Sequence, residues 1–204
     1  MRRIAIRTLE RMERGELRTL VAGYVSSEAY RVRKFESRGR VVLRLDRALR
    51  GRPFRKRFPL SQEEWARYRE VMQEGSSLGA YDGGKLVGVA LAERREWNRS
   101  LWVWEIGVAA THRRRGIGSA LIRELTRRAR ASGLRVLVCE TQTTNVPAID
   151  FYRRNGFTLD GIDLSYYTNR DTERGEVAVF MKKRITGRGG PRKGSRTKGP
   201  HTSK

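Results

Sequence analysis

Cysteine and histidine are nearly absent from this chain of 204 residues. It has one cysteine, Cys139, and two histidines. A single cysteine excludes an intrachain disulfide and a cysteine-based zinc or iron–sulfur site, and two histidines add too few ligands for a metal enzyme. We therefore expect no metal at the functional site.

Long apolar runs are absent as well. No run approaches the roughly 18 residues that a membrane-spanning helix needs. The first residues, Met1-Arg2-Arg3, lead into no apolar segment of signal-peptide length. We expect no membrane contact and a cytoplasmic location. Hydrophobic residues still make up 38% of the chain, which is enough for one domain with a substantial core.

Acidic residues are scarce relative to basic ones. The chain has 22 Asp and Glu against 45 Lys and Arg, a formal charge of +23, and a pI near 11.3. Residues 1–57 hold 18 basic against 6 acidic residues, residues 58–185 hold 21 against 16, and residues 186–204 hold six against none. Such a balance favours nucleic acid, an anionic surface or an anionic ligand as a partner.

This uneven composition divides the chain into three segments. Residues 186–204 contain no Leu, Ile, Val, Phe, Tyr or Trp, so we predict a disordered basic tail. Residues 58–185 are predicted to form the domain. Residues 1–57 read irregularly, with strand-like stretches at 30–35 and 41–45. We predict that they are a basic N-terminal part of the domain or an appendage to it.

Helical and strand patterns alternate through the predicted domain. Ser61 followed by Glu64 predicts a capped helix to residue 73, and Asp82-Gly83-Gly84 predicts a hairpin between 78–81 and 85–91. The patterns continue with strand 101–108, helix 117–131, strand 134–139, helix 147–155 and strands at 157–159 and 176–181. This order predicts an α/β domain with a mixed sheet.

The loop 109–119, between a predicted strand and a predicted helix, is rich in arginine and glycine. Gly116 and Gly118 let the backbone approach a ligand closely, and unpaired first-turn amides favour an anion. Arginines 113–115 add charged donors. The pattern predicts a pyrophosphate cradle, with a basic surface loop as the alternative. It is neither a P-loop nor the motif Gly-x-Gly-x-x-Gly, because residue 121 is leucine.

Two motifs are similar to those of a known family. Arg-x-x-Gly-x-Gly at 113–118 resembles the acetyl-CoA pyrophosphate loop of the GCN5-related N-acetyltransferase (GNAT) superfamily. Asn-x-x-Ala-x-x-Phe-Tyr-x-x-x-Gly-Phe at 145–157 resembles a second segment of that family. The stretches 96–99 and 140–142, with Gly161, Asp163 and Tyr167, narrow the resemblance to streptothricin acetyltransferases. It covers 78–185 well, 1–77 loosely and the tail not at all.

The resemblance implies the GNAT fold: a mixed, mostly antiparallel central sheet with helices on both faces and a splayed parallel strand pair that binds acetyl-CoA. Acetyl-CoA would be the co-substrate, and no metal would be needed. The backbone of Ile106 and Val108 would bind the pantetheine, with the Val108 amide as oxyanion donor. Asn145 would contact the cofactor or cap a helix. The implied cradle comprises Arg113, Arg114, Arg115, Gly116, Ile117, Gly118 and Ser119.

The resemblance also implies two catalytic side chains. Tyr152 matches the tyrosine that bonds the CoA sulfur and acts as general acid, a role that suits a phenol protonated at neutral pH. Core packing beside Phe151 is the alternative. Glu105 is the candidate base, directly or through water, or else a ligand for a cationic substrate or a structural arginine. Glu140 is a second candidate. Trp104 stands where the subgroup has a glutamate, so one of two carboxylates is missing.

These features predict an N-acetyltransferase that moves an acetyl group to a primary amine by direct attack. A streptothricin-type antibiotic is the sharpest acceptor, and a protein amine or another small amine is the alternative. A basic protein steers such a cation only toward a locally acidic pocket, for which the candidates are Asp160, Asp163, Asp171 and Glu173. A nucleic-acid- or ribosome-associated protein, binding weakly through basic flanks, is the alternative class. The oligomeric state stays open, a homodimer included.

Overall fold

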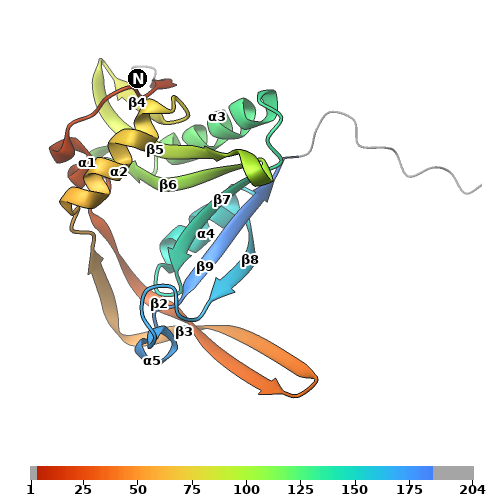
Figure 1. Ribbon diagram of the computed structural model, residues 1–204. Helices are drawn as coiled ribbons and strands as arrows, with labels where there is room; N and C mark the ends of the chain where they lie inside the picture. Colours follow the sequence, from red (N-terminus) through yellow and green to blue (C-terminus); the bar gives the residue numbers. More distant parts are fainter. Residues whose placement is uncertain (1–3, 186–204) are drawn as a thin grey trace, which may run out of the picture.

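Seven strands form the central sheet of the computed structural model, which describes residues 4–185 (Figure 1). In spatial order they are β1 (Ala5–Thr8), β4 (Leu78–Asp82), β5 (Lys85–Arg95), β6 (Ser100–Val108), β7 (Val136–Gln142), β9 (Ala178–Arg184) and β8 (Thr158–Asp163). Every neighbouring pair is antiparallel except β6 and β7, which are parallel. The predicted mixed, mostly antiparallel sheet is confirmed.

Helices cover both faces of this sheet, as expected. α1 (Arg14–Leu20) and α2 (Gln62–Gln73) lie on one face, and α3 (Ile117–Ala131) and α4 (Val146–Arg154) on the other (Figure 1). A short helix, α5 (Asp171–Arg174), precedes β9. Side chains of β5 alternate between the two layers: Val89 and Leu91 pack with α1 and α2, while Ala90 and Ala92 pack with α3.

The local signals in the predicted domain act as expected. The Ser61 hydroxyl accepts the Glu64 N–H at 3.0 Å, and the Glu64 carboxylate accepts the Ser61 N–H at 2.7 Å, so this pair caps α2. The turn between β4 and β5 contains Gly83 and Gly84, both with positive φ. α3 has the predicted bounds, 117–131. The glycine- and arginine-rich loop therefore lies between β6 and α3, as predicted.

Residues 23–57 differ from the sequence expectation. Instead of short strands at 30–35 and 41–45, β2 (Gly23–Ser37) and β3 (Arg40–Arg57) form one long hairpin that extends beyond the main sheet (Figure 1). The Tyr30 N–H donates to the Thr143 carbonyl at 2.9 Å. The Tyr24 and Thr144 hydroxyls lie 2.6 Å apart. These contacts fix the base of the hairpin beside the chain that connects β7 to α4. β1 and α1 were not predicted either.

The parallel strands β6 and β7 separate partway along their length. Ser100–Val103 pair with Val136–Cys139, and beyond this point β6 and β7 continue without pairing to each other. The separation begins at Trp104, an extra residue that bulges from β6 where Leu91 and Ala92 of β5 pair with Glu105 and Val103. The fold thus contains the expected splayed pair.

Three expectations from the sequence concern a membrane-spanning helix, a metal site and the basic tail. Within residues 4–185, no helix combines the length and apolar character needed to cross a membrane. In the same residues, no group of three or more His, Cys, Asp or Glu side chains is arranged to hold a metal ion. The predicted basic tail, 186–204, lies outside the described residues.

Candidate active site

The diverging ends of β6 and β7 enclose a cleft of about 470 Å³. The predicted base, Glu105, lines it, and so do Trp104 and Glu140. Six of the predicted cofactor-binding residues also line this cleft: Ile106, Val108, Arg113, Gly118, Asn145 and Tyr152. The fold therefore brings residues from both family-like motifs to one cavity.

One backbone edge of β6 faces this cleft. The Ala109 N–H donates to the Val87 carbonyl at 2.9 Å, on the β5 side. Because N–H groups alternate in direction along a strand, the N–H and C=O of Val108 face the opposite side, toward β7. The Val108 carbonyl accepts a hydrogen bond from Arg113 Nε at 3.1 Å. The Val108 amide is thus directed into the cleft, where an oxyanion donor is needed.

The loop before α3 has the backbone shape of an anion site. Arg114 and Gly116 have φ values of 62° and 79°, in the left-handed region. Successive amides in such turns form a concave anion site, and the first N–H groups of α3 have no acceptor within the helix. Ile117 is buried in the core, so only its backbone faces a ligand. The cradle residues that do not line the cleft itself are Arg114, Arg115, Gly116, Ile117 and Ser119.

The two glycines of this loop serve different purposes. A Cβ at Gly118 would lie 3.1 Å from the Phe151 ring, whereas a Cβ at Gly116 would meet nothing within 4 Å. Gly118 therefore allows α4 to pack closely against α3, and Gly116 supplies the positive φ of the helix N-cap. Since Gly118 also lines the cleft, close approach of a ligand to these glycines stays a prediction.

Tyr152 is both a core residue and a cleft residue. Its side chain is 6% exposed, packs edge-on against Phe151 and lines the cleft. Burial raises the pKa of Tyr152 well above its usual range, and the hydrogen-bonded Cys139 thiol raises it further. The phenol is therefore protonated at neutral pH, as a general acid must be. The core packing and the predicted role are compatible.

Asn145 is the N-cap of α4. Its Oδ1 accepts the Ala148 N–H at 3.3 Å, and Pro147 lies in the first turn of the helix. The capping alternative from the sequence is confirmed. Since Asn145 also lines the cleft, contact between its amide group and the cofactor stays a prediction.

Glu105 follows the bulge of β6 and is half-buried. Its Oε1 accepts the Tyr68 hydroxyl of α2 at 2.7 Å. Burial raises the pKa of Glu105 to about 7, although the Tyr68 hydrogen bond acts in the opposite direction; the charge of Glu140 also raises it. A carboxylate that titrates near neutral pH can both accept and release a proton. Its hydrogen-bond partner is thus a tyrosine, and not the structural arginine considered from the sequence.

A second cavity, of about 390 Å³, shares Glu105 with the cleft. Three carboxylates line it, those of Glu64, Glu105 and Glu140. Tyr167 donates its hydroxyl to Glu140. Burial raises the pKa of Glu140, and the Tyr167 hydrogen bond and the charge of Lys56 partly offset this. Carboxyl groups thus line the inner wall of this cavity, although Arg18, Lys56 and Arg57 also line it.

The four acidic residues that were expected to make the substrate pocket locally acidic lie elsewhere. Asp160, Asp163, Asp171 and Glu173 line neither the cleft nor the second cavity. Asp171, for example, accepts the backbone N–H groups of Tyr167 and Thr168, both at 2.8 Å. Its carboxylate is used to hold the Tyr167 loop in place.

Two residues of α2 at the site were not predicted, Glu64 and Tyr68. Their signal in the sequence is the spacing of four residues, which places both on one face of a helix. That face could not be assigned to a site before the sheet it covers was known. Tyr167 entered the sequence argument only through the family resemblance.

Trp104 gives the site a flat apolar wall at the position where the resemblance leads one to expect a carboxylate. Its indole Nε1 donates to Glu93 Oε2 at 2.8 Å, and the guanidinium groups of Arg67 and Arg95 lie 5.6 and 5.9 Å from its ring centroid. Trp104 lines both the cleft and the second cavity. Glu105 consequently has an aromatic neighbour where the resemblance leads one to expect a glutamate.

Comparison with known proteins relates this arrangement to one family. A model of the acetyltransferase (GNAT) family matches residues 43–157, more than half of the chain. The streptothricin acetyltransferase of Streptomyces lavendulae is 40% identical over 98 residues, which are 48% of this chain and 51% of that protein. The matching segment thus spans about half the length of this curated relative.

Two solved structures share the fold over most of the chain. Nourseothricin acetyltransferase has a TM-score of 0.67 and 31% identity, over 90% of this chain and 99% of that one. A candidate streptothricin acetyltransferase of Bacillus anthracis, solved in complex with acetyl coenzyme A, has a TM-score of 0.66 over the same shares. At 20% identity it shows the fold alone. With its splayed strands, its cradle loop and the match over residues 43–157, the chain belongs to the acetyltransferase (GNAT) family.

Proposed function

We propose that the chain is a cytoplasmic acetyl-CoA-dependent N-acetyltransferase that transfers an acetyl group to a primary amine by direct attack. One observation carries this proposal above the others. Glu105, whose pKa of about 7 suits a base, lies in the wall shared by the cleft between β6 and β7 and the carboxylate-lined second cavity. An amine in the second cavity and an acyl donor in the cleft would meet beside it.

The cleft and the adjoining loop fit acetyl-CoA. The left-handed turn at Gly116 and the first-turn amides of α3 suit a pyrophosphate, and the exposed arginines 113–115 add positive charge. The β6 edge at Val108 faces the cleft, as an extended pantetheine chain requires for backbone pairing. Asn145 and the backbone of Ile106 line the same path. Bound there, acetyl-CoA supplies an electrophilic thioester carbonyl.

Three groups of the chain would then act on the reacting atoms. Glu105 takes the proton that the amine loses, directly or through a water molecule. The Val108 N–H donates to the oxygen on which negative charge develops. The Tyr152 hydroxyl, held protonated by its burial, gives a proton to the departing thiolate. No covalent bond to the enzyme is needed, because the amine is itself the nucleophile.

For the acceptor we propose a cationic amine of the streptothricin type. The carboxyl groups of Glu105 and Glu140 in the inner wall support this choice, and they weaken the objection that a basic protein would repel such a substrate. The name of the relative in Streptomyces lavendulae supports it too. A protein amine or another small amine is the alternative acceptor.

Thiol release from acetyl-CoA tests the function directly. The purified chain is mixed with acetyl-CoA and a panel of amines that includes streptothricin, simple alkylamines and peptides with free N-termini. We expect release with at least one small cationic amine at a rate well above hydrolysis. Release with peptides only would replace the proposed acceptor, and release with no amine would contradict the enzymatic proposal.

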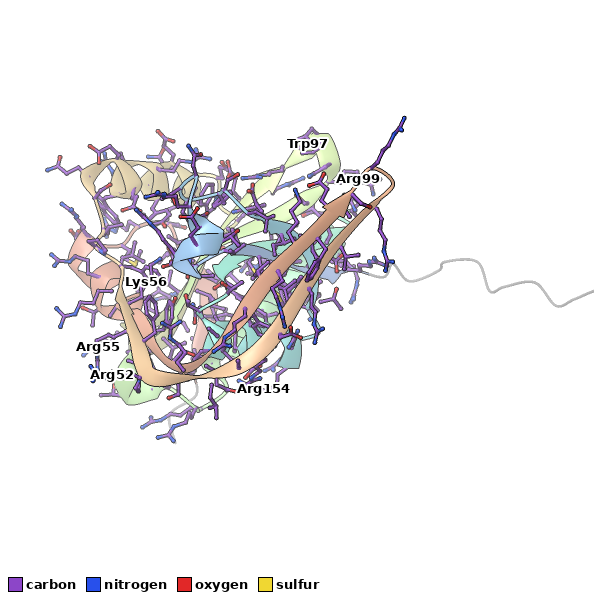
Figure 2. The ribbon with its side chains drawn as sticks, turned by 90° about the horizontal axis from the view of Figure 1, so that it is seen from below. Arg52, Arg55, Lys56, Trp97, Arg99 and Arg154 are labelled. Atoms are coloured by element: carbon purple, nitrogen blue, oxygen red, sulfur yellow. The ribbon has the colours of Figure 1, made fainter. Side chains whose placement is uncertain are left out.

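The β2–β3 hairpin favours a second candidate function. Residues 23–57 hold 12 Lys and Arg against three Asp and Glu. Figure 2 labels three of them, Arg52, Arg55 and Lys56, on β3. We propose weak, salt-sensitive binding of nucleic acid by this hairpin, which would add to the transfer reaction without replacing it.

A further inference from the structure

A buried polar atom at the wall of the second cavity, where the acceptor amine is proposed to bind, has no hydrogen-bond partner among the described residues. Gln142, the last residue of β7, is 9% exposed and lines both the cleft and the second cavity. Among residues 4–185, its carboxamide oxygen, Oε1, has no hydrogen-bond donor. Buried acceptors are almost always paired in folded proteins, so this oxygen calls for a donor from a ligand.

The orientation of this carboxamide is fixed by its neighbours. The Tyr167 hydroxyl has one proton, which it donates to Glu140. Its oxygen must therefore accept from Gln142, and Nε2 donates to it at 3.1 Å. The reverse orientation would set two acceptors against each other. The chain from Glu140 through Tyr167 to Gln142 thus leaves Oε1 as the unpaired end.

The surroundings of this oxygen suit a positive charge. Glu105 and Glu140 are half-buried in the inner wall, whereas Arg18 and Arg57, which also line the second cavity, are exposed. Lys56 is paired with Glu176. An ammonium group has three N–H donors and no acceptor, so it can satisfy a carbonyl and a carboxylate together. Gln142 lines this cavity and the terminal torsion of glutamine is soft, so Oε1 can adjust toward such a donor.

We infer that Gln142 and Glu140 form a binding site for a second ammonium group of the acceptor, separate from the amine that reacts beside Glu105. The inference rests on the proposed transferase function and narrows its substrate class to diamines. The amine that attacks must lose its charge before it reacts, so a permanent anionic site adds little to its binding free energy. A group that stays charged throughout the reaction gains most from one.

Matched amines test this site. Initial rates are measured with 1,5-diaminopentane and 1-aminopentane, which differ only in the second amine. The wild-type chain is expected to have a KM at least about tenfold lower for the diamine. Gln142→Leu should raise the diamine KM about tenfold and leave kcat and the monoamine KM nearly unchanged.

Two outcomes would overturn the inference. One is a wild-type chain without preference for the diamine, and the other is Gln142→Leu raising both KM values equally, as a structural role would. Should Gln142→Leu fail to fold, Tyr167→Phe replaces it, because this change releases the Gln142 carboxamide. We expect it to reduce the preference for the diamine, and an unchanged preference would contradict the site.

A binding measurement separates this inference from the proposed function. Calorimetric titration of 1,5-diaminopentane into the wild-type chain should give at least about tenfold tighter binding than titration into Gln142→Leu. If the wild-type chain released no thiol with any amine, the transferase proposal would fail while this difference could still support the site. Equal affinities would overturn the site even in an active enzyme.

Discussion

Glu105 and Tyr152 reach the same cleft from different elements, and burial affects both in the same direction. It raises the pKa of the Glu105 carboxyl to about 7 and that of the Tyr152 phenol well above its usual range. For the carboxyl, this makes proton uptake possible at neutral pH. For the phenol, it keeps the proton in place until the thiolate departs beside it. One physical cause thus suits both the proposed base and the proposed acid.

Replacing Glu105 by glutamine should lower kcat/KM by about 10²- to 10³-fold, because the amine loses its proton acceptor. In the wild-type chain, kcat/KM should rise with pH through a midpoint near 7, where Glu105 becomes ionised. The variant should lack this midpoint. Glu70→Gln, on the exposed side of α2, is the control. If the midpoint near 7 persisted in Glu105→Gln, the titration would belong to another group.

The same variant should change the pH dependence of stability. The pKa of Glu105 is raised from 4.5 in the unfolded chain to about 7 in the folded one. The folded state therefore holds this proton more tightly, and the associated stability is lost as pH rises between these values. Glu105→Gln should melt a few degrees above the wild-type chain at about pH 8, with the difference shrinking toward about pH 5. A difference that does not vary with pH would contradict burial of an ionisable carboxyl.

Replacing Tyr152 by phenylalanine should lower kcat about tenfold to a hundredfold, with little change in either KM, because the leaving thiolate loses its proton donor. The ring still packs against Phe151 and Phe157, so the melting temperature should hardly move. Tyr166→Phe, outside both cavities, is the control. Full activity in Tyr152→Phe would leave the tyrosine with a packing role only.

The N-terminus of α3 shows how one element prepares a binding site. Its first residue, Ile117, is buried in the core, whereas the preceding N-cap, Gly116, is exposed. The helix is thus anchored by its side chains while its first amides stay open to a ligand. The left-handed backbone at Gly116 connects this helix to the arginine-bearing loop.

Gly116→Ala tests this arrangement, because an alanine strains a backbone with φ of 79°. We expect a stability loss of about 1 kcal/mol and a KM for acetyl-CoA raised several-fold. Gly75→Ala is a matched control: Gly75 has φ of 75°, and a Cβ there would also meet nothing within 4 Å. It should cost similar stability without affecting acetyl-CoA. Equal KM values in the two variants would argue against the cradle.

The elements from α2 to β9, apart from the short α5, could be predicted from sequence, whereas β1, α1 and the full length of the hairpin strands could not. Helices such as α3 bury one stripe of side chains, so their periodicity is visible. In the hairpin, Phe35, Val41 and Leu49 are exposed. The buried residues of β2 are confined to its first half, so no continuous buried face marks the strands. The N-cap of α1 is Glu13, which is not one of the usual capping residues.

The residues of the site could likewise be predicted only in part. The cradle, Asn145 and Tyr152 belong to contiguous motifs, so they could be placed in advance. The hydrogen bonds from Tyr68 to Glu105 and from Tyr167 to Glu140 join residues 37 and 27 positions apart. Only the folded sheet, with α2 on one face, brings these pairs together. The acidic wall of the acceptor cavity could not be identified without them.

The net charge of +23 is unevenly distributed, and charged residues serve different purposes in different parts of the molecule. At the loop before α3 it accompanies a site suited to a pyrophosphate. In the second cavity the carboxyl groups of Glu64, Glu105 and Glu140 balance the charges of Arg18, Lys56 and Arg57. The hairpin holds much of the remaining excess on an exposed two-stranded ribbon. Overall charge is therefore a poor guide to the acceptor.

Replacing Arg52 and Arg55 together by glutamine tests the proposed role of the hairpin. In binding to a poly-uridine oligonucleotide, the slope of log affinity against log salt should fall by about 1.4, because each lost phosphate contact removes about 0.7. Arg123→Gln with Arg130→Gln, on the exposed face of α3, makes the same change in charge and should leave the slope unchanged. Equal slopes for all three chains would exclude the hairpin as the binding surface.

The central claim is that Glu105 couples a cofactor cleft to a carboxylate-lined acceptor cavity. Its most direct test is the rate of thiol release from acetyl-CoA by the wild-type chain with streptothricin and with a matched set of simpler amines. We predict release with cationic small amines, fastest for acceptors that carry a second ammonium group. Absence of release with every amine, at saturating acetyl-CoA, would contradict the account.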